Sequence, residues 1–326
     1  MKKVLNENML LTEIDRATLR TIVYFDIFDF PLTANEVYKY LIARNVTSDK
    51  AVIHSLQNLE SFLGHREGFY FLKNREDTIE LRKDNYLLSD EKYKLAINNI
   101  KLLKKCAFVK AIFITNKLSY SNPRENGDID IAIVCQAGRI WSCRFFTTLM
   151  MKLLGRRPTK IKQKNKICLS FFLDEKNLNL EKFAGENDLH LAFWVRQFVP
   201  IFDPEKINAK IQQENIWINK LLPNCQEYVV NQRRRVSRRS WMQAVWLIIS
   251  PKRLENVFRK IQLNKLSIDL KNKLGQNNND VVMNDAILKL HSTDRRKYFN
   301  QLWEKRCKEI IPQFSITELF KTLINK

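Results

Sequence analysis

The stretch ITNKLSYSNPRENGDIDIAIV (114–134) places two aspartates, Asp128 and Asp130, at the start of an apolar run. Isoleucines at every second position alternate with these aspartates and with the small residues that follow, and a period of two predicts a β-strand. Residues i and i+2 of a strand point to the same face, with Cα atoms roughly 6.5–7 Å apart. Two carboxylates on one face repel each other and resist burial unless a cation lies between them. Paired hard oxygen ligands favour Mg²⁺, so the stretch predicts a metal-binding strand.

The composition bounds the class of protein. The 326 residues include only seven glycines and eight prolines, which predicts two or three helix-rich domains with short connections. Six cysteines without a C-x-x-C pair predict reduced thiols of a cytoplasmic protein. Four scattered histidines show no metal-ligand spacing, which argues against a histidine–zinc enzyme. The N-terminus lacks the apolar segment of a secretion signal, and the apolar run WMQAVWLII (241–249) is too short to span a bilayer.

The net charge of +21 is unevenly distributed along the chain. Residues 1–92 carry a net charge of −2, residues 93–205 carry +9 and residues 206–326 carry +14. A polyanionic partner, such as a nucleic-acid acceptor, is therefore expected to dock on the last two-thirds of the chain. The basic clusters at 156–166 and 233–239 could steer a nucleotide or a nucleic acid, or they could be solvated loops and helix faces.

The acidic N-terminal part has the pattern of a winged helix. Helical spacing at 19–28, 34–43 and 50–63 is followed by a predicted β-hairpin with glycines at 64 and 68. Thr33, three residues before Glu36, predicts a capping box at the second helix. The third helix could read DNA through polar residues at 50, 54, 57 and 58, or the module could serve packing alone. The net negative charge favours packing, because DNA affinity rests on phosphate neutralisation.

The central part predicts a small α/β core, and the last third predicts helices. Strands are expected at 108–115, 127–134 and 166–173, with helices at 90–106 and 139–155. Further helices are expected within 207–222, 240–249, 252–274 and 294–311. The tryptophans at 217, 241, 246 and 303 lie at helical spacing and are expected in the core.

With these elements in place, the sequence resembles the nucleotidyltransferase superfamily related to DNA polymerase β, whose signature is Gly-Ser on a turn and Asp-x-Asp on the next strand. It is more narrowly similar to uncharacterised bacterial proteins that pair an N-terminal winged helix with such a domain. The segment TNKLSYSNPRENGDID (115–130) follows their spacing without a gap. Softer matches are Trp141 with Arg144, ICLSFF (167–172), PIFD (200–203) and HSTDRR (291–296).

The resemblance implies that Asp128 and Asp130 hold Mg²⁺, which bridges the phosphates of a nucleoside triphosphate (NTP). The positions of the Gly-Ser turn are Asn116 and Lys117 in this chain. Asn116 tolerates positive φ. Lys117 would place a point charge on the phosphates, or its side chain would fill the space that they need.

Two serines and the third carboxylate of the family complete the expected site. Ser119 and Ser121 are further phosphate-side candidates, although Ser121 is equally consistent with a plain turn residue. The third carboxylate is absent from its expected strand, where positions 168, 170 and 172 should share one face and the polar member is Ser170. Asp174 has the right parity but lies about 13 Å beyond Ser170. Two carboxylates can still hold one Mg²⁺, but efficient transfer would then lack its base.

We therefore predict an α+β, helix-rich protein of three parts: a winged helix (1–92), a nucleotidyltransferase-like α/β core with a mixed sheet (93–205) and a helical domain (206–326). The leading hypothesis is Mg²⁺-dependent transfer of a nucleoside monophosphate from an NTP to an unidentified acceptor, with Asp128 and Asp130 as catalytic residues. One alternative is a catalytically inactive protein that binds a nucleotide or nucleic acid, and another is a winged-helix DNA-binding regulator. In a purely structural alternative, Asp128 lies at a solvated strand end and Asp130 pairs with a lysine.

Overall fold

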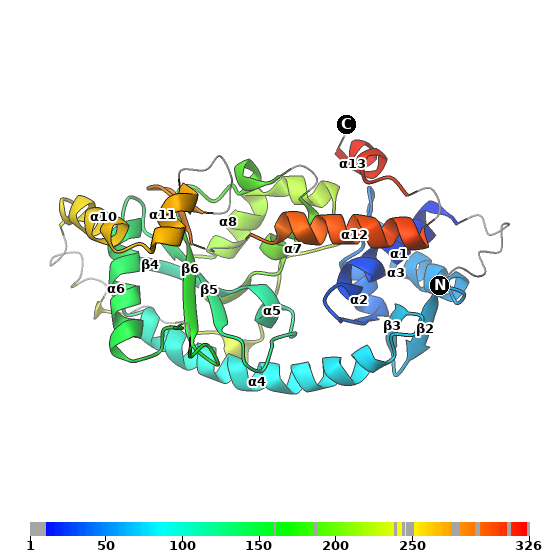
Figure 1. Cartoon of the computed structure of the whole chain (residues 1–326), viewed down its shortest axis with the longest axis horizontal. Coiled ribbons are helices and arrows are strands. Elements are labelled where there is room, and N and C mark those ends of the chain that lie inside the picture. The colour runs from blue at the N-terminus through cyan, green and yellow to red at the C-terminus, as the bar shows by residue number, and fades with distance from the viewer. Residues whose placement is uncertain are drawn as a thin grey trace.

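The computed structural model describes residues 11–159, 161–185, 188–237, 240–242, 245, 251–274, 281–290, 294–311 and 314–324. The N-terminal helices and the large sheet lie at opposite ends of an elongated molecule, and one long helix runs beneath both (Figure 1). The expected α+β class with a mixed sheet is confirmed. No helix in these described ranges is long and apolar enough to cross a membrane.

Three helices and a β-hairpin form the N-terminal end, in the order that the sequence predicts. They are α1 (Glu13–Asp26), β1 (Leu32–Thr33), α2 (Ala34–Lys39), α3 (Asp49–Asn58), β2 (Leu63–Arg66) and β3 (Phe69–Leu72). The expected capping box is present, because the Thr33 hydroxyl accepts from the Glu36 N–H and the Glu36 carboxylate accepts from the Thr33 N–H. The hairpin turn holds Glu67 and Gly68 at φ 55° and 79°, the left-handed region that a two-residue hairpin loop uses.

Helix α4 (Asp77–Leu103) is the long helix beneath both ends of the molecule (Figure 1). Its 27 residues extend over about 40 Å. Ile79 is buried near its start and Ile100 near its end, whereas Leu87 in the middle is 69% exposed. The helix was expected only from residue 90. The part of α4 before residue 90 buries no continuous apolar face, so its apolar residues do not recur at helical spacing.

The large sheet has the strand order β7-β4-β5-β6-β9-β8. Its strands are β4 (Val109–Ile114), β5 (Ile129–Cys135), β6 (Ile167–Asp174), β7 (Val199–Phe202), β8 (Val282–Met283) and β9 (Ile287–Lys289). β5 and β6 are parallel and are joined through α6 (Ile140–Leu153), and the other neighbours are antiparallel. The expectation of helices throughout the last third is therefore wrong at 282–289, where two short strands extend the sheet of the central part.

The structure has seven further α-helices in its described residues. They are α5 (Asn116–Ser119), α7 (Leu189–Arg196), α8 (Ile207–Glu214), α10 (Leu254–Asn264), α11 (Ile268–Leu274), α12 (Arg296–Ile310) and α13 (Ile316–Ile324), with short 3₁₀ turns at Glu181–Phe183, Ile216–Lys220 and Gln232–Arg234. Most of the helix expected at 240–249, Trp246 included, lies outside the described residues. Trp241 is 79% exposed, so the expectation that it lies in the core is wrong.

The two faces of the sheet pack into different cores. The isoleucines of β5 face α4 and α6, together with Tyr93 and Trp141. Ala132 and Val134 face the opposite way, into the core that holds α1, α7 and α12. Because side chains alternate along a strand, Asp130 belongs to this second face. The acidic positions of β5 are therefore directed toward helices from both ends of the chain.

Helix α12 returns from the C-terminal part of the chain and packs on α1. Trp303 is fully buried, and its indole N–H donates to the Arg20 carbonyl oxygen at 2.9 Å. The Arg20 guanidinium in turn donates to the carbonyl oxygen of Ile42 at 2.6 Å, and Arg306 pairs with Asp26 at the end of α1. The two ends of the chain thus form one continuous hydrophobic core.

Replacing Trp303 by alanine should lower the free energy of unfolding by about 3–5 kcal/mol, because it leaves a large cavity between α1 and α12. Urea denaturation followed by circular dichroism measures this change. The matched control is Trp241→Ala, which removes an exposed indole and should cost less than about 0.5 kcal/mol. Equal, small effects of the two substitutions would mean that α12 does not stabilise α1.

Candidate metal and ligand site

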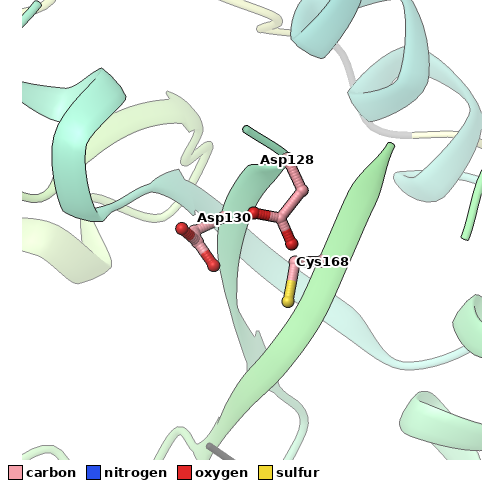
Figure 2. Close-up of side chains that lie close together, drawn as sticks. All are labelled: Asp128, Asp130 and Cys168. Carbon is pink, nitrogen blue, oxygen red and sulfur yellow. The ribbon is translucent and has the colours of Figure 1, made fainter. Parts of the chain in front are cut away.

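Asp128, Asp130 and Cys168 come together where β5 and β6 begin (Figure 2). Asp128 directly precedes β5, Asp130 lies on it, and Cys168 is the residue of β6 paired with Asp130. One ligand atom of each side chain lies within 4.8 Å of those of the other two. The structure thus brings together the two predicted aspartates and adds a thiol. The sequence hint was that positions 168 and 170 share strand parity, but the serine was considered and not the cysteine.

A register shift in β6 changes which side chains lie at the site, although the Ser170 side chain still forms a hydrogen bond with the Cys168 thiol. Ile131 pairs with Leu169, but the next residue of β5 pairs with Phe171, so Ser170 is an extra residue between them. Phe171 therefore follows Cys168 on the acidic face, whereas Phe172 lies in the opposite core. The expectation that 168, 170 and 172 share one face is wrong for this reason.

Asp174 serves a loop at the far end of the same strand pair. It lies opposite Cys135, and its carboxylate accepts from the backbone N–H groups of Gly138 and Lys176 at 2.6 and 2.9 Å. It does not supply a third carboxylate at the beginning of the strand. Within the described part of the chain, the metal-ligating group formed here is two carboxylates and one thiol.

The turn before Asp128 is fixed by Lys92, a lysine of α4 that is only 1% exposed. Its ammonium group donates to the carbonyl oxygens of Glu125 at 3.2 Å and Gly127 at 2.7 Å, and to the Asn165 side chain at 2.9 Å. Asn165 comes just before β6, and its own N–H donates to the Gly127 carbonyl oxygen. A single buried ammonium therefore joins the starts of both strands that carry the site.

Asn116 takes the left-handed conformation that its position requires. Its φ is 56°, which agrees with the expectation that asparagine tolerates positive φ where the family has glycine. Its side-chain oxygen accepts from the indole N–H of Trp194 on α7 at 2.8 Å. A hydrogen bond from the Asn116 side chain also reaches Asp130. Asn116 therefore connects the acidic strand to the helix that covers it.

The other three predicted phosphate-side residues separate into one that faces the site and two that do not. Lys117 lines a cavity together with the aspartates. The Ser119 hydroxyl is buried and donates to the Asn116 carbonyl oxygen at 2.6 Å, so it closes the short helix α5. Ser121 occupies a turn at φ 59°, which matches its alternative as a turn residue. Neither serine lines the cavity.

The cavity has a volume of about 630 Å³ and lies between the N-terminal helices and the sheet. This is within the usual range for a small-molecule site. The acid pair, Asp128 and Asp130, is at one part of its wall, and the aromatic part is made by α1, α7 and α12. Aromatic lining residues include Tyr24, Phe28, Phe193, Trp194 and Phe299. Sequence reasoning did not predict this part, because its residues belong to helices that are distant in the chain.

Five cations line the cavity, and two of them, Lys289 and Arg296, pair with Asp294. The other three come from different segments: Lys117 after β4, Arg124 in the turn before β5, and Arg295 at the start of α12. Burial lowers the pKa of Lys117, and the nearby positive charges of Arg124 and Arg295 lower it further. A lysine whose pKa is lowered by neighbouring positive charges indicates a region that would bind an anion favourably.

Burial is the main cause of the pKa shifts of Asp130 and Cys168. It raises the pKa of Asp130, which hydrogen bonds from Asn116 and Cys168 partly offset. Burial likewise raises the pKa of the Cys168 thiol, and the two carboxylates raise it further, so the thiol is neutral at pH 7. Among the described residues, no lysine or arginine forms an ion pair with Asp130, which contrasts with the structural alternative of an Asp130–lysine pair. A cation between the carboxylates would relieve both the burial and the repulsion.

Several arginines of the two basic clusters make contacts within the protein. In the segment 156–166, Arg156 donates to the Asn99 side chain and Arg157 to the Ile167 carbonyl oxygen. In the second cluster, the Arg234 guanidinium stacks 3.8 Å from the centre of the Tyr93 ring. Residues 160, 238 and 239 of these clusters lie outside the described residues. The arginines named here have structural contacts, so they contribute less to steering an anion than the sequence suggested.

Comparison with models of protein families gives no match, and searches of curated proteins and of solved structures give none either.

Replacing Lys92 by methionine should lower the free energy of unfolding by about 2–3 kcal/mol, because two carbonyl oxygens and the Asn165 side-chain oxygen lose a charged donor. Thermal and urea denaturation measure the loss. Lys94→Met is the matched control, because Lys94 lies on the same helix and makes only an exposed pair with Asp90. If the two variants are equally stable, the ammonium of Lys92 does not hold the turn.

Proposed function

We propose that the cavity binds a Mg²⁺–nucleoside triphosphate at Asp128 and Asp130, and that the chain is a nucleotidyltransferase. The observation that carries this proposal is the acid pair on the wall of a ligand-sized cavity, beside a left-handed turn at Asn116. The spacing of turn and aspartates is the one through which the sequence resembles that superfamily. Under this proposal the N-terminal elements are a winged helix, and the sheet with its helices is the transferase core.

The donor set fits Mg²⁺ with two carboxylates. Mg²⁺ prefers six oxygen ligands and usually retains water and substrate phosphate oxygens beside one or two carboxylates. The neutral thiol of Cys168 is a poor ligand for so hard an ion. Asp128 and Asp130 would therefore hold the ion, and the bound ion would neutralise developing charge on the phosphates.

The chain's own residues supply the rest of the phosphate environment. Lys117, Arg124 and Arg295 line the same cavity and would neutralise the polyphosphate. Asn116 orients Asp130 and is itself held by Trp194, so the carboxylate is fixed before the ligand arrives. Such preorganisation lowers the cost of binding.

A second candidate is nucleotide binding without turnover, and Cys168 favours it. The described residues place a thiol beside Asp130, where a third carboxylate would act as base on the acceptor hydroxyl. A neutral thiol with a raised pKa is a weak base at pH 7. Transfer would then depend on an acceptor that is already nucleophilic, and in its absence the nucleotide would only be bound.

The winged-helix regulator receives less support from the contacts. Polar residues of α3 such as Lys50 and His54 are exposed, but residues 1–92 are net negative. Helix α1 is buried along nearly its whole length, where it packs on α3, β3 and α12, and its Tyr24 stacks on Phe193 of α7. We propose that this module serves mainly as a wall of the ligand cavity.

Isothermal titration calorimetry with each of the four NTPs should show binding to the wild-type chain that requires Mg²⁺. Asp128→Asn and Asp130→Asn each remove one charged ligand and should weaken Mg²⁺–NTP binding at least about tenfold. Asp90→Asn, which alters an exposed carboxylate of α4, should bind as the wild type does. Binding that is indifferent to Mg²⁺ and to both site variants would refute the metal site.

Replacing Cys168 by aspartate should raise the affinity for Mg²⁺ and the rate of pyrophosphate release from an NTP, because it places a third carboxylate beside Asp130. Cys168→Ser is the control of similar size that adds no charge. Release of pyrophosphate by the wild type at a rate equal to that of Cys168→Asp would instead show that the chain already has a competent base.

A further inference from the structure

Opposite the acid pair, the cavity contains a histidine that the proposed phosphate and metal contacts do not use. His190 lies on α7 one turn before Trp194, and both side chains line the cavity. The Nδ1 atom of His190 is 2.9 Å from the Tyr24 hydroxyl of α1. The ring is stacked on Phe299 of α12, with centroids 5.1 Å apart and planes inclined by 29°. Three helices from different parts of the chain therefore fix this one imidazole.

We propose that the aromatic half of the cavity is a subsite for a planar aromatic ring, and that His190 reads the edge of that ring through Nε2. This proposal rests on the proposed nucleotide site for the other half of the ligand. The ring would be either the nucleobase of the NTP or an aromatic ring of the acceptor, and both share the same chemistry.

The hydrogen bonding of the imidazole leaves one nitrogen for a ligand. In the described part of the chain, the side-chain hydrogen bond of His190 is the one between Nδ1 and Tyr24. A neutral imidazole has one donor and one acceptor nitrogen, and the Tyr24 hydroxyl can donate to Nδ1 or accept from it, so in either tautomer Nε2 is the nitrogen left for a ligand. In each tautomer Nε2 is either a donor or an acceptor, and it would distinguish rings by the complementary group at their edge.

The protonation of His190 supports a neutral reader rather than a charged one. Burial lowers the pKa of His190 to about 4, while the carboxylates of Asp188 and Asp294 oppose this shift and Arg296 adds to it. Both carboxylates are engaged with Arg296, at 2.6 and 2.8 Å. The charged groups around His190 are thus largely compensated, and the imidazole is neutral at pH 7.

The surrounding rings match a flat ligand. Tyr24 lies on α1 and Phe28 in the turn that follows it. Phe193 and Trp194 lie on α7, and Phe299 lies on α12. Tyr24 and Phe193 are themselves stacked with centroids 4.4 Å apart, so the wall is rigid. Stacking on aromatic side chains binds any planar ring, and the imidazole edge would add the selectivity that stacking lacks.

Two substitutions of His190 separate its two nitrogens. His190→Asn retains an amide near the Nδ1 position, where Tyr24 can still bond, but lacks a group at Nε2. His190→Gln extends an amide nitrogen toward the Nε2 position. Calorimetry should show that His190→Asn weakens ring-containing ligands at least tenfold, whereas His190→Gln weakens them much less. His54→Asn alters an exposed histidine of α3 and should have no effect.

The probes distinguish the two sources of the ring. If the nucleobase occupies the subsite, Mg²⁺–NTPs bind wild type more tightly than Mg²⁺–tripolyphosphate does, and His190→Asn abolishes this difference. If an acceptor ring occupies it, NTPs and tripolyphosphate bind alike, and tyrosinamide or adenosine binds the ATP-saturated wild type but not His190→Asn. Equal binding of NTPs and tripolyphosphate with no binding of either ring probe overturns the subsite.

The same titrations separate this proposal from the proposed function. Mg²⁺–tripolyphosphate binding depends on the acid pair and the cations alone, so the metal site predicts that Asp128→Asn weakens it. Tripolyphosphate binding that is indifferent to Mg²⁺ and to Asp128→Asn, with the ring effect intact, would refute the metal site and leave the ring subsite standing. Retained tripolyphosphate binding without any ring effect would refute the subsite and leave the metal site standing. Circular dichroism melting of each His190 variant shows whether the fold survives the substitution.

Discussion

The buried ammonium of Lys92 is the interaction on which the acidic site depends. A charged group with almost no solvent contact persists only when its donors are satisfied, and here three acceptors from two loops surround it. Those loops begin β5 and β6, so the same contact that satisfies the lysine sets where Asp128 emerges. Because Lys92 lies on α4, which reaches the N-terminal helices, the acid pair is also placed relative to the wall opposite it.

The cavity exists because both ends of the chain pack against the same face of the sheet. Helix α1 provides one wall and α12 another, and Trp303 bonds the backbone of α1 across 283 positions of sequence. The aspartates of β5 lie on this face rather than on the one covered by α4 and α6. Had β5 been shifted by one residue, its isoleucines would face the cavity and its carboxylates would be buried in an apolar core.

The sequence predicted the features that are governed by neighbouring residues. The capping box at Thr33, the strand at 127–134 and the positive φ tolerated by Asn116 are all local choices of backbone and side chain. The rest was decided by contacts that are distant in the chain. Strand β9 is three residues long and forms only because β6 offers an edge. The extra residue at Ser170 moves Phe171 onto the acidic face of the sheet. The alternation of apolar and polar residues along β6 does not predict this shift. The hydrogen-bond acceptors of Lys92 are mostly backbone oxygens. Every residue has such an oxygen, so the amino-acid sequence does not indicate which ones Lys92 contacts.

Under the proposed function, the charges around the cavity account for the binding of a nucleotide at this site. Relative to the superfamily that the sequence resembles, Lys117 stands at the position of a small neutral serine, and the group that lies beside Asp128 and Asp130 is a neutral thiol rather than a third carboxylate. Both changes make the site more positive, and two further cations, Arg124 and Arg295, add to this. A polyphosphate carries several negative charges, so a site with fewer carboxylates and more cations favours its binding in the ground state. Binding that is already strong in the ground state does not lower the barrier for transfer, which requires interactions made only in the transition state. Under the proposed function, the features that favour the ligand therefore favour retention over turnover, unless the acceptor brings the reactivity that Cys168 does not provide.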